Sequence, residues 1–308
     1  MKIIMMGSGG VGGFFGGRLA HAGYDVSFVA RGTHLAAMRD HGLTIESDSQ
    51  PKIHIDAVSV TDDPSSLGVA DLIIVSVKLR DTAEAIRLIK PAIGPDTGVL
   101  SLQNGVIKDD LLRAAFPARN IMGGVAYVAT HVARPGVIQQ VGTMQRIIVG
   151  EYDGRKSARA GFLVEALRKS GVNAELSADI RADIWKKYVF LVGLSGATTA
   201  MRSTLGPILA NPRACAYFES LMREVIAVGR ASGVNLPEDY ADDRMKFAHG
   251  LPDDMTSSMH HDLERGQPLE VNWLSGGVVQ IGEKVGVSTP ANRAICDILA
   301  LHADGRKG

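Results

Sequence analysis

Short apolar runs alternate with amphipathic stretches through the first half of the chain, whereas the second half holds amphipathic stretches alone. Alternation of this kind predicts parallel strands joined by crossover helices. The run Leu72-Ile73-Ile74-Val75 is apolar on both faces, as a strand between two helix layers must be. The strands we expect span residues 2–6, 25–30, 71–77, 98–101, 121–127, 146–150 and 172–176, and the helices among them span 11–22, 35–40, 81–89 and 108–115.

From residue 179 onward the strand pattern stops, and the spacing predicts helices over residues 179–199, 215–231, 237–250, 253–264, 270–285 and 290–303. The change of period near residue 178 predicts two domains, residues 1–178 and residues 179–308. We therefore expect an α/β fold, in which a doubly wound parallel sheet is followed by an all-helical C-terminal domain.

The charge balance limits the classes of partner. Basic and acidic residues number 33 each, which argues against nucleic acid or a membrane surface as the main partner. The longest apolar stretch, residues 188–201, is shorter than the ~20 residues of a membrane-spanning helix. The N-terminal residues are typical of a first strand rather than a signal peptide, so we expect a cytoplasmic protein. Two cysteines, Cys215 and Cys296, are too few for a disulfide framework or a metal site.

A glycine-rich turn, Gly7-Ser8-Gly9-Gly10-Val11-Gly12, follows the first expected strand and opens the first expected helix. This position is typical of a Rossmann-type dinucleotide-binding turn. Gly7 would make the tight turn, Gly9 would let a pyrophosphate approach the backbone, and Gly12 would let helix and strand pack closely. The helix N-terminus would offer free N–H groups and a partial positive charge to the phosphates. A glycine turn without a ligand is the alternative.

The residue after the second expected strand indicates which dinucleotide binds. A site for NAD usually places an acidic residue there to bond the ribose 2′-hydroxyl. This chain has Arg31 instead, followed by Gly32-Thr33-His34. An arginine can bind the 2′-phosphate of NADP through charge-assisted hydrogen bonds. Arg31 therefore favours NADP(H) as the cofactor of residues 1–178, and a solvated surface arginine is the alternative.

Lys187 lies at helical spacing from Ile184 and Leu191, on a mainly apolar helix face. Burial of a lysine weakens its hold on the proton, which suits an acid catalyst. The spacing alone leaves a second interpretation equally open, in which the side chain extends to solvent at the helix edge.

Glu270 is expected to begin a helix whose small residues, Ser275, Gly276 and Gly277, favour close helix packing. A glutamate in a first turn also complements the helix dipole, so a capping role is the alternative to a functional one. The adjacent histidines His260 and His261 point to different faces of a helix, and their spacing fits no metal site.

Taken together, these residues resemble the ketopantoate reductase family (2-dehydropantoate 2-reductases), and the resemblance covers almost the whole chain. The matching pieces are MKIIMMGSGGVGG, Arg31, DLIIVSVK ending at Lys78, SLQNGV with Asn104, IRADIWKK with Lys187, and TSSMHHDLERGQPLEVNWLSG with Ser258, Asp262 and Glu270.

The resemblance implies a Rossmann domain, a helical domain and an active site in the cleft between them. It implies that NADPH gives a hydride to the carbonyl of a small 2-oxo acid, in pantothenate biosynthesis, and that Lys187 protonates the developing alkoxide. Glu270 would be catalytic together with Lys187 and would also hold substrate, as would Ser258 and Asp262. Asn104 would lie beside both nicotinamide and substrate, and Lys78 would bind cofactor. A homodimer is one option for an oligomeric state that the sequence leaves open.

The chain departs from the family pattern at two positions. After the lysine the family typically has Asn at the fourth and eighth positions, where this chain has Leu191 and Ser195. Both would line the substrate site, so the departure puts ketopantoate itself in question. Two alternatives follow: a paralogue acting on a less polar 2-oxo or 2-hydroxy acid, and a non-catalytic NADP-sensing protein. Lys187 and Glu270 together argue against the sensor, which needs neither.

Overall fold

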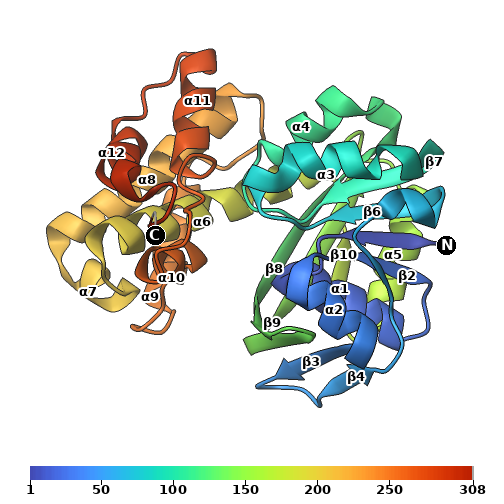
Figure 1. Ribbon diagram of the computed structural model, residues 1–308. Helices are drawn as coiled ribbons and strands as arrows, with labels where there is room; N and C mark the ends of the chain where they lie inside the picture. Colours follow the sequence, from blue (N-terminus) through green and yellow to red (C-terminus); the bar gives the residue numbers. More distant parts are fainter. Residues whose placement is uncertain (307–308) are drawn as a thin grey trace. The chain divides into compact units, whose positions relative to one another are not determined.

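Two compact units make up the chain in the computed structural model, which describes residues 1–306 (Figure 1). The first unit comprises Met1–Gln103 and Lys108–Asp183, and the second comprises Asn104–Ile107 and the chain from Ile184 onward. The division lies inside one helix, α6 (Ile180–Met201), a few residues beyond the boundary expected at 178. The short segment Asn104–Ile107 belongs by its contacts to the second unit, which the sequence did not indicate.

A ten-stranded sheet forms the centre of the first unit, in the order β4-β3-β9-β8-β7-β6-β1-β2-β5, with β10 also paired to β9. The part from β5 to β8 is entirely parallel and has the strand order of a dinucleotide-binding fold, with the order reversing between β1 and β6. Its strands are β1 (Ile3–Met6), β2 (Val26–Val29), β5 (Ser59–Thr61), β6 (Ala70–Val75), β7 (Ile93–Ser101) and β8 (Ile121–Arg134).

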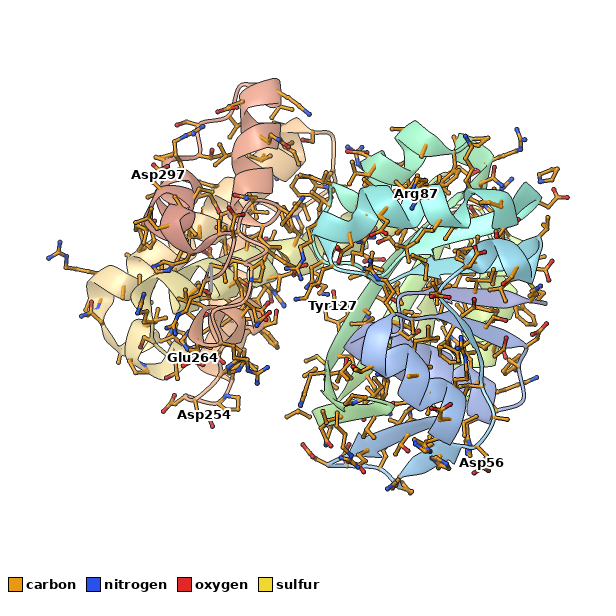
Figure 2. All side chains as sticks on the ribbon, viewed as in Figure 1. Asp56, Arg87, Tyr127, Asp254, Glu264 and Asp297 are labelled. Carbon is orange, nitrogen blue, oxygen red and sulfur yellow. The ribbon has the colours of Figure 1, made fainter. Side chains whose placement is uncertain are left out.

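Helices cover both faces of this sheet, as the apolar strands predict. In β1, Ile3 and Met5 join one hydrophobic core, whereas Ile4 and Met6 join the other. The first core contains residues of α1 (Gly10–His21), α2 (Gly32–His41) and α5 (Ala158–Lys169), and the second contains residues of α3 (Thr82–Ile89) and α4 (Lys108–Ala115). Charged side chains such as Asp56 and Arg87 lie on the outside (Figure 2). The α/β fold class expected from the sequence is confirmed.

The sheet differs from the expectation in one respect, since it is not wholly parallel. Strand β9 (Val137–Glu151) runs antiparallel to β8 in a long hairpin, whose turn places Gly136 at φ +76°. The remaining strands are β3 (Leu43–Ser47), β4 (Ile53–Ile55) and β10 (Asn173–Leu176), of which β4 pairs antiparallel with β3. The sequence did not predict β3, β4, β5, the outer part of the hairpin or α5. Ser157 caps α5 by accepting from the N–H of Ala160.

The second unit is helical, as expected. Helices α6 and α8 pack closely, because a Cβ on Gly193 would lie 2.7 Å from Cγ of Met222. The helices besides α6 are α7 (Leu205–Ala210), α8 (Pro212–Ala231), α9 (Tyr240–His249), α10 (Ser258–Glu264), α11 (Ser275–Val285) and α12 (Pro290–Leu299). Short 3-10 helices span Pro64–Leu67, Leu79–Asp81, Lys90–Ala92, Ala118–Asn120 and Ala300–His302.

Three of these helices begin later than predicted. The expected starts at residues 237, 253 and 270 become 240, 258 and 275, and α7 was not predicted. The difference at α11 concerns the candidate site, because residues 270–274 form a separate turn before that helix. Among the residues described, none of the helices is both long and apolar enough to cross a membrane.

Candidate active site

The glycine-rich turn lies where the strand order of the sheet reverses. Gly7 follows β1 with φ +97°, and its carbonyl accepts a 2.7 Å hydrogen bond from the Ser76 hydroxyl at the end of β6. A Cβ on Gly12 would lie 2.0 Å from the Gly7 oxygen, and a Cβ on Gly10 would lie 2.5 Å from the Thr130 oxygen of β8. Gly7 therefore makes the tight turn and Gly12 permits close packing, as the sequence predicts.

The remaining residues of the turn differ in what they leave available to a ligand. A Cβ on Gly9 would have nothing within 4 Å, so the protein itself does not require a glycine there. Gly9 is the N-cap of α1 and provides no side-chain cap, which leaves the first backbone N–H groups of the helix for another partner. The side chains of Ser8 and Val11 face inward: Ser8 donates to the Val29 carbonyl at 3.0 Å, and Val11 packs against the core.

His34 on α2 bonds to this turn, a role that was not predicted from the sequence. Its Nδ1 accepts from the backbone N–H of Gly136 at 3.0 Å, and its Nε2 lies 2.8 Å from the Ser8 oxygen. Because Nδ1 is an acceptor, Nε2 carries the proton and donates to Ser8. Burial lowers the pKa of His34, and the bond to Ser8 only partly offsets this, so the ring is held neutral. A neutral His34 thus links the glycine turn to the β8–β9 hairpin.

Two predicted cofactor residues lie at the same edge of the sheet. Arg31 follows β2 as the N-cap of α2, and Lys78 follows β6. The carboxyl ends of parallel strands share one edge, so both belong to the edge that carries Gly7. Arg31 is exposed and its Nη1 lies 2.9 Å from Oε2 of Glu84, in the first turn of α3. This acidic partner was not predicted.

In the second unit, one amide connects the two predicted catalytic residues. The Lys187 ammonium on α6 donates to Oδ1 of Asn104 at 3.0 Å, and the Asn104 amide donates to Oε2 of Glu270 at 3.3 Å. Lys187 is half-buried and Glu270 is buried. Asn104 thus orients the lysine through its oxygen and the carboxylate through its nitrogen. Ammonium, amide and carboxylate form one polar group that can donate a proton and bind polar atoms of a small molecule.

Glu270 does not begin a helix, which corrects the expectation. Its backbone carbonyl accepts from the N–H groups of Trp273 at 3.0 Å and Leu274 at 2.9 Å, closing a turn before α11. Tyr188, next to Lys187 on α6, donates to the Leu274 carbonyl at 2.6 Å and is fully buried. Burial raises the pKa of Tyr188, so its hydroxyl remains a donor. This role of Tyr188 was not predicted, because it depends on a contact across 86 residues.

The two positions that depart from the family pattern prove different. Leu191, one helical turn after Lys187, is partly exposed. Ser195 is completely buried, and its hydroxyl has no hydrogen-bond partner among the residues described. Ser195 is therefore enclosed in the helical core, whereas Leu191 can meet a molecule that enters from solvent.

The residues expected on α10 are spread around that helix. Ser258 is exposed at its first position, and the neighbouring Ser257 provides the cap by accepting from the N–H of His260. Asp262 is half-buried. His260 is buried and its Nδ1 lies 2.9 Å from the Thr198 oxygen, while His261 is exposed, so the two histidines face different ways. Within residues 1–306, no group of three or more metal-ligating side chains is placed to hold a metal ion.

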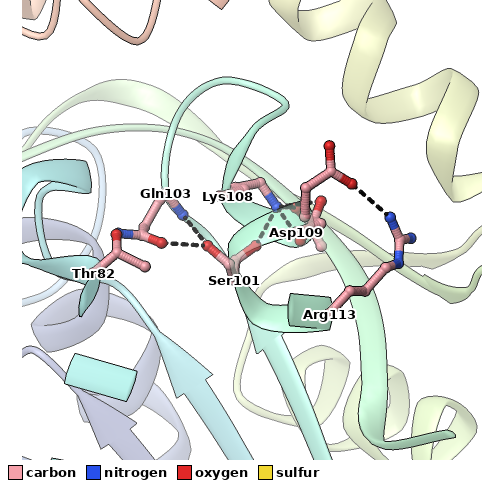
Figure 3. A network of polar contacts seen from close by, with 8 residues as sticks. Thr82, Ser101, Gln103, Lys108, Asp109 and Arg113 are labelled. Carbon is pink, nitrogen blue, oxygen red and sulfur yellow. Dashed lines mark hydrogen bonds and ion pairs between the residues drawn. The ribbon is translucent and has the colours of Figure 1, made fainter. Parts of the chain in front are cut away.

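A buried polar network holds the chain on both sides of Asn104 (Figure 3). On one side, the Gln103 amide donates to the Val77 carbonyl at 3.0 Å and to the Thr82 hydroxyl at 2.8 Å. On the other side, Lys108 is 1% exposed and its ammonium donates to the carbonyls of Ser101 at 2.7 Å and Gly124 at 3.0 Å.

The ammonium of Lys108 also lies 3.1 Å from both carboxylate oxygens of Asp109. Burial lowers the pKa of Lys108 and the charge of Asp109 opposes this shift. All three N–H groups of the lysine can therefore be bonded. Gln103 and Lys108, the residues that flank the segment Asn104–Ile107, are thus both held by hydrogen bonds within the first unit.

Comparison with known proteins identifies the family. Residues 3–154 match the model of the family "Ketopantoate reductase PanE/ApbA", and residues 179–303 match the model of its C-terminal domain. A 2-dehydropantoate 2-reductase of Mesorhizobium japonicum is 32% identical over 316 residues, which cover 96% of this chain and 95% of that protein.

Solved structures agree. A PanE/ApbA family ketopantoate reductase from Ralstonia eutropha JMP134 is 32% identical with a TM-score of 0.88, and 98% of each chain is covered. D-mandelate dehydrogenase, solved with NADH and anilino(oxo)acetate, has the same fold with a TM-score of 0.88 over 98% of each chain, at 22% identity. From the two family models and a relative matched along nearly its whole length, the chain belongs to the ketopantoate reductase family of oxidoreductases.

Proposed function

We propose that this protein is an NADPH-dependent reductase that converts a 2-oxo acid to a 2-hydroxy acid, with Lys187 as the general acid. The observation that carries the proposal is the pair of hydrogen bonds by which Asn104 joins Lys187 to Glu270. Family membership supports the reaction class, since several relatives are named 2-dehydropantoate 2-reductases.

The first unit is suited to a dinucleotide. Gly7 and Gly12 are required by the turn itself, whereas Gly9 faces open space and the α1 N-terminus has no side-chain cap. Residues 7–12 would bind the pyrophosphate through backbone N–H groups, and Arg31 and Lys78 would supply positive charge. The bound dinucleotide would supply the hydride.

Arg31 is what distinguishes NADPH from NADH in this proposal. D-mandelate dehydrogenase shares the fold and was solved with NADH, so the fold alone does not select the cofactor. The guanidinium of Arg31 pairs with Glu84 at the surface, where both side chains are about half exposed. Exposed ion pairs contribute only about 0–1 kcal/mol, so a dianionic 2′-phosphate can compete for the arginine.

The residues of the second unit would handle the proton. As a hydride reaches the carbonyl carbon of the 2-oxo acid, negative charge develops on the carbonyl oxygen. The Lys187 ammonium would donate its proton to that oxygen, completing the 2-hydroxy acid, and would regain a proton from solvent. General acid assistance of this kind is worth about 10²–10⁴ in rate. Asn104 would hold the ammonium in position, and Glu270 would accept a hydrogen bond from a polar group of the substrate.

A second candidate concerns the substrate, and Leu191 supports it. Leu191 is partly exposed one turn beyond Lys187 and cannot bond a substrate hydroxyl, while the Ser195 hydroxyl is enclosed. A 2-oxo acid with an apolar side chain therefore suits Leu191 better than ketopantoate does. A non-catalytic NADP sensor would have no need of the Lys187–Asn104–Glu270 arrangement.

The test is a panel of 2-oxo acids, with ketopantoate and analogues of increasing apolar character, assayed with NADPH and with NADH by loss of cofactor absorbance. The proposal expects turnover with NADPH on at least one member of the panel, and the second candidate expects apolar members to give the higher kcat/KM. Tight binding of NADPH without turnover of any member would favour the sensor and contradict the proposal.

A further inference from the structure

Tyr188 is a buried tyrosine whose hydroxyl contacts the turn that carries Glu270. It follows Lys187 on α6, and its hydroxyl lies 2.6 Å from the Leu274 carbonyl and 3.3 Å from the Trp273 carbonyl. Its pKa is raised by burial, so the hydroxyl stays protonated and donates. The tyrosine therefore connects the helix of the lysine directly to the turn of the carboxylate.

Backbone hydrogen bonds close the turn itself. The Glu270 carbonyl accepts from Trp273 and Leu274, and the Gly276 N–H donates back to the Val271 carbonyl at 2.9 Å. This last bond spans five residues, as in a π-type turn, so the turn does not continue the ladder of α11. Leu274, the residue before α11, has ψ −94°, well outside helical values, and no side chain caps the helix. The chain changes direction at the carbonyl that Tyr188 holds.

Helix α11 is built to come close to this tyrosine. A Cβ on Gly277 would lie 2.8 Å from the Tyr188 hydroxyl oxygen, so only glycine allows the approach without displacement. The ring of Tyr188 also packs edge-on against Trp185, with ring centroids 5.6 Å apart. Packing against Gly277 and Trp185 thus fixes the position of the Tyr188 side chain. Its hydroxyl can in turn fix the turn through the hydrogen bond to Leu274.

We propose that Tyr188 is a positioning residue, whose bond to the Leu274 carbonyl sets the Glu270 turn so that the carboxylate meets the Asn104 amide and, through it, Lys187. This inference rests on the proposed reductase activity for its kinetic consequence, but its structural consequence is independent of any substrate. Tyr188 touches none of the reacting atoms, and its hydroxyl acts only through Glu270.

The test compares Tyr188→Phe with a matched control in the same unit. Tyr217 on α8 also donates its hydroxyl to a backbone carbonyl, that of Ala291 at 2.8 Å, so Tyr217→Phe loses an equivalent bond elsewhere. Each variant keeps the ring and its packing. Tyr188→Phe is expected to lower kcat about 10- to 100-fold, the scale of a small misplacement of catalytic groups, with KM for NADPH unchanged. Tyr217→Phe should keep wild-type kcat.

A double-variant cycle with Glu270→Gln separates positioning from general loss of stability. If Tyr188 acts through Glu270, Tyr188→Phe costs much less in kcat when Glu270 is already replaced. An equal cost in both backgrounds, or a single variant with wild-type kcat, overturns the proposal.

Amide hydrogen exchange of residues 270–276 needs no activity, so it decides on Tyr188 even if the proposed reaction is wrong. Faster exchange in Tyr188→Phe than in Tyr217→Phe is expected, and equal exchange overturns the proposal. Should Tyr188→Phe fail to fold, Gly277→Ala, which pushes against the hydroxyl, is expected to give the same faster exchange and the same loss of kcat. Wild-type behaviour of Gly277→Ala would then contradict the role.

Discussion

The Lys187 ammonium lies 3.0 Å from Oδ1 of Asn104, a residue 83 positions earlier in the chain. The Asn104 side chain has its oxygen on the lysine and its nitrogen on Glu270, so its replacement removes one hydrogen bond from each. One amide therefore bonds both the lysine and the carboxylate of the candidate site.

Replacing this amide should reduce kcat. Asn104→Ala removes the acceptor for Lys187, and we expect kcat to fall about 10- to 100-fold because the ammonium is no longer held towards the substrate. Steady-state kinetics with NADPH measures this. Asn272→Ala is the matched control, since the Asn272 side chain is exposed two residues after Glu270. Equal kcat for both variants would mean that the bridge has no part in catalysis.

The ion pair between Arg31 and Glu84 leads to opposite predictions for its two members. Arg31→Ala should weaken NADPH binding by roughly one to two orders of magnitude, because charge-assisted hydrogen bonds to the 2′-phosphate contribute about 1.5–3 kcal/mol. NADH binding should barely change. Glu84→Gln should strengthen NADPH binding, since it frees the guanidinium and removes a negative charge. Calorimetric titration with each cofactor tests both, and equal affinity of the wild type for NADPH and NADH would refute the assignment.

Leu191 should control the choice of substrate. A leucine at this partly exposed position, one turn beyond Lys187, leaves a polar substrate group unpaired, which costs about 1–3 kcal/mol. Leu191→Asn is therefore expected to raise kcat/KM for ketopantoate about 10- to 100-fold relative to an apolar 2-oxo acid. Ser195→Ala serves as the control, because the enclosed hydroxyl should not affect selectivity. A wild type that already prefers ketopantoate strongly would show that Leu191 is neutral.

His34 should make stability depend on pH. Its folded-state pKa is lowered by burial, so the unfolded chain binds more protons below the ordinary histidine value of about 6.5. The contribution of the neutral ring is fully present above that pH and is lost as the pH falls through the folded-state pKa. A protonated Nδ1 would also face the Gly136 N–H. Denaturation midpoints across mildly acidic pH should fall less steeply for His34→Gln, and parallel curves for the two proteins would disprove the role.

Elements of the fold could be predicted wherever burial is uniform. The strand β6 is apolar from Leu72 to Val75 because helices cover both of its faces there, and the glycine turn after β1 is defined by its neighbours in sequence. The outer parts of β8 and β9 contain polar residues such as Gln139 and exposed residues such as Val141. They therefore lack the apolar run of a buried strand. The start of α11 was misplaced because Glu270 bonds helically to Leu274 before the chain turns away.

The candidate site was less accessible to sequence analysis. Lys187, Glu270 and Asn104 could be named by resemblance to a family, but the bonds between them join residues far apart in the chain. The partners Glu84 of Arg31 and Leu274 of Tyr188 lie 53 and 86 positions away, respectively. No local pattern encodes such contacts, because they arise only when separate strands and helices pack together.

The most direct test of the account is the turnover of Lys187→Ala with NADPH and the best 2-oxo acid, measured beside Lys186→Ala, which alters the adjacent lysine on the same helix. If Lys187 is the general acid, its variant loses about 10²–10⁴ in kcat while NADPH affinity stays within about twofold of wild type. Lys186→Ala should keep most of its activity. A Lys187→Ala protein with wild-type kcat would contradict the central claim.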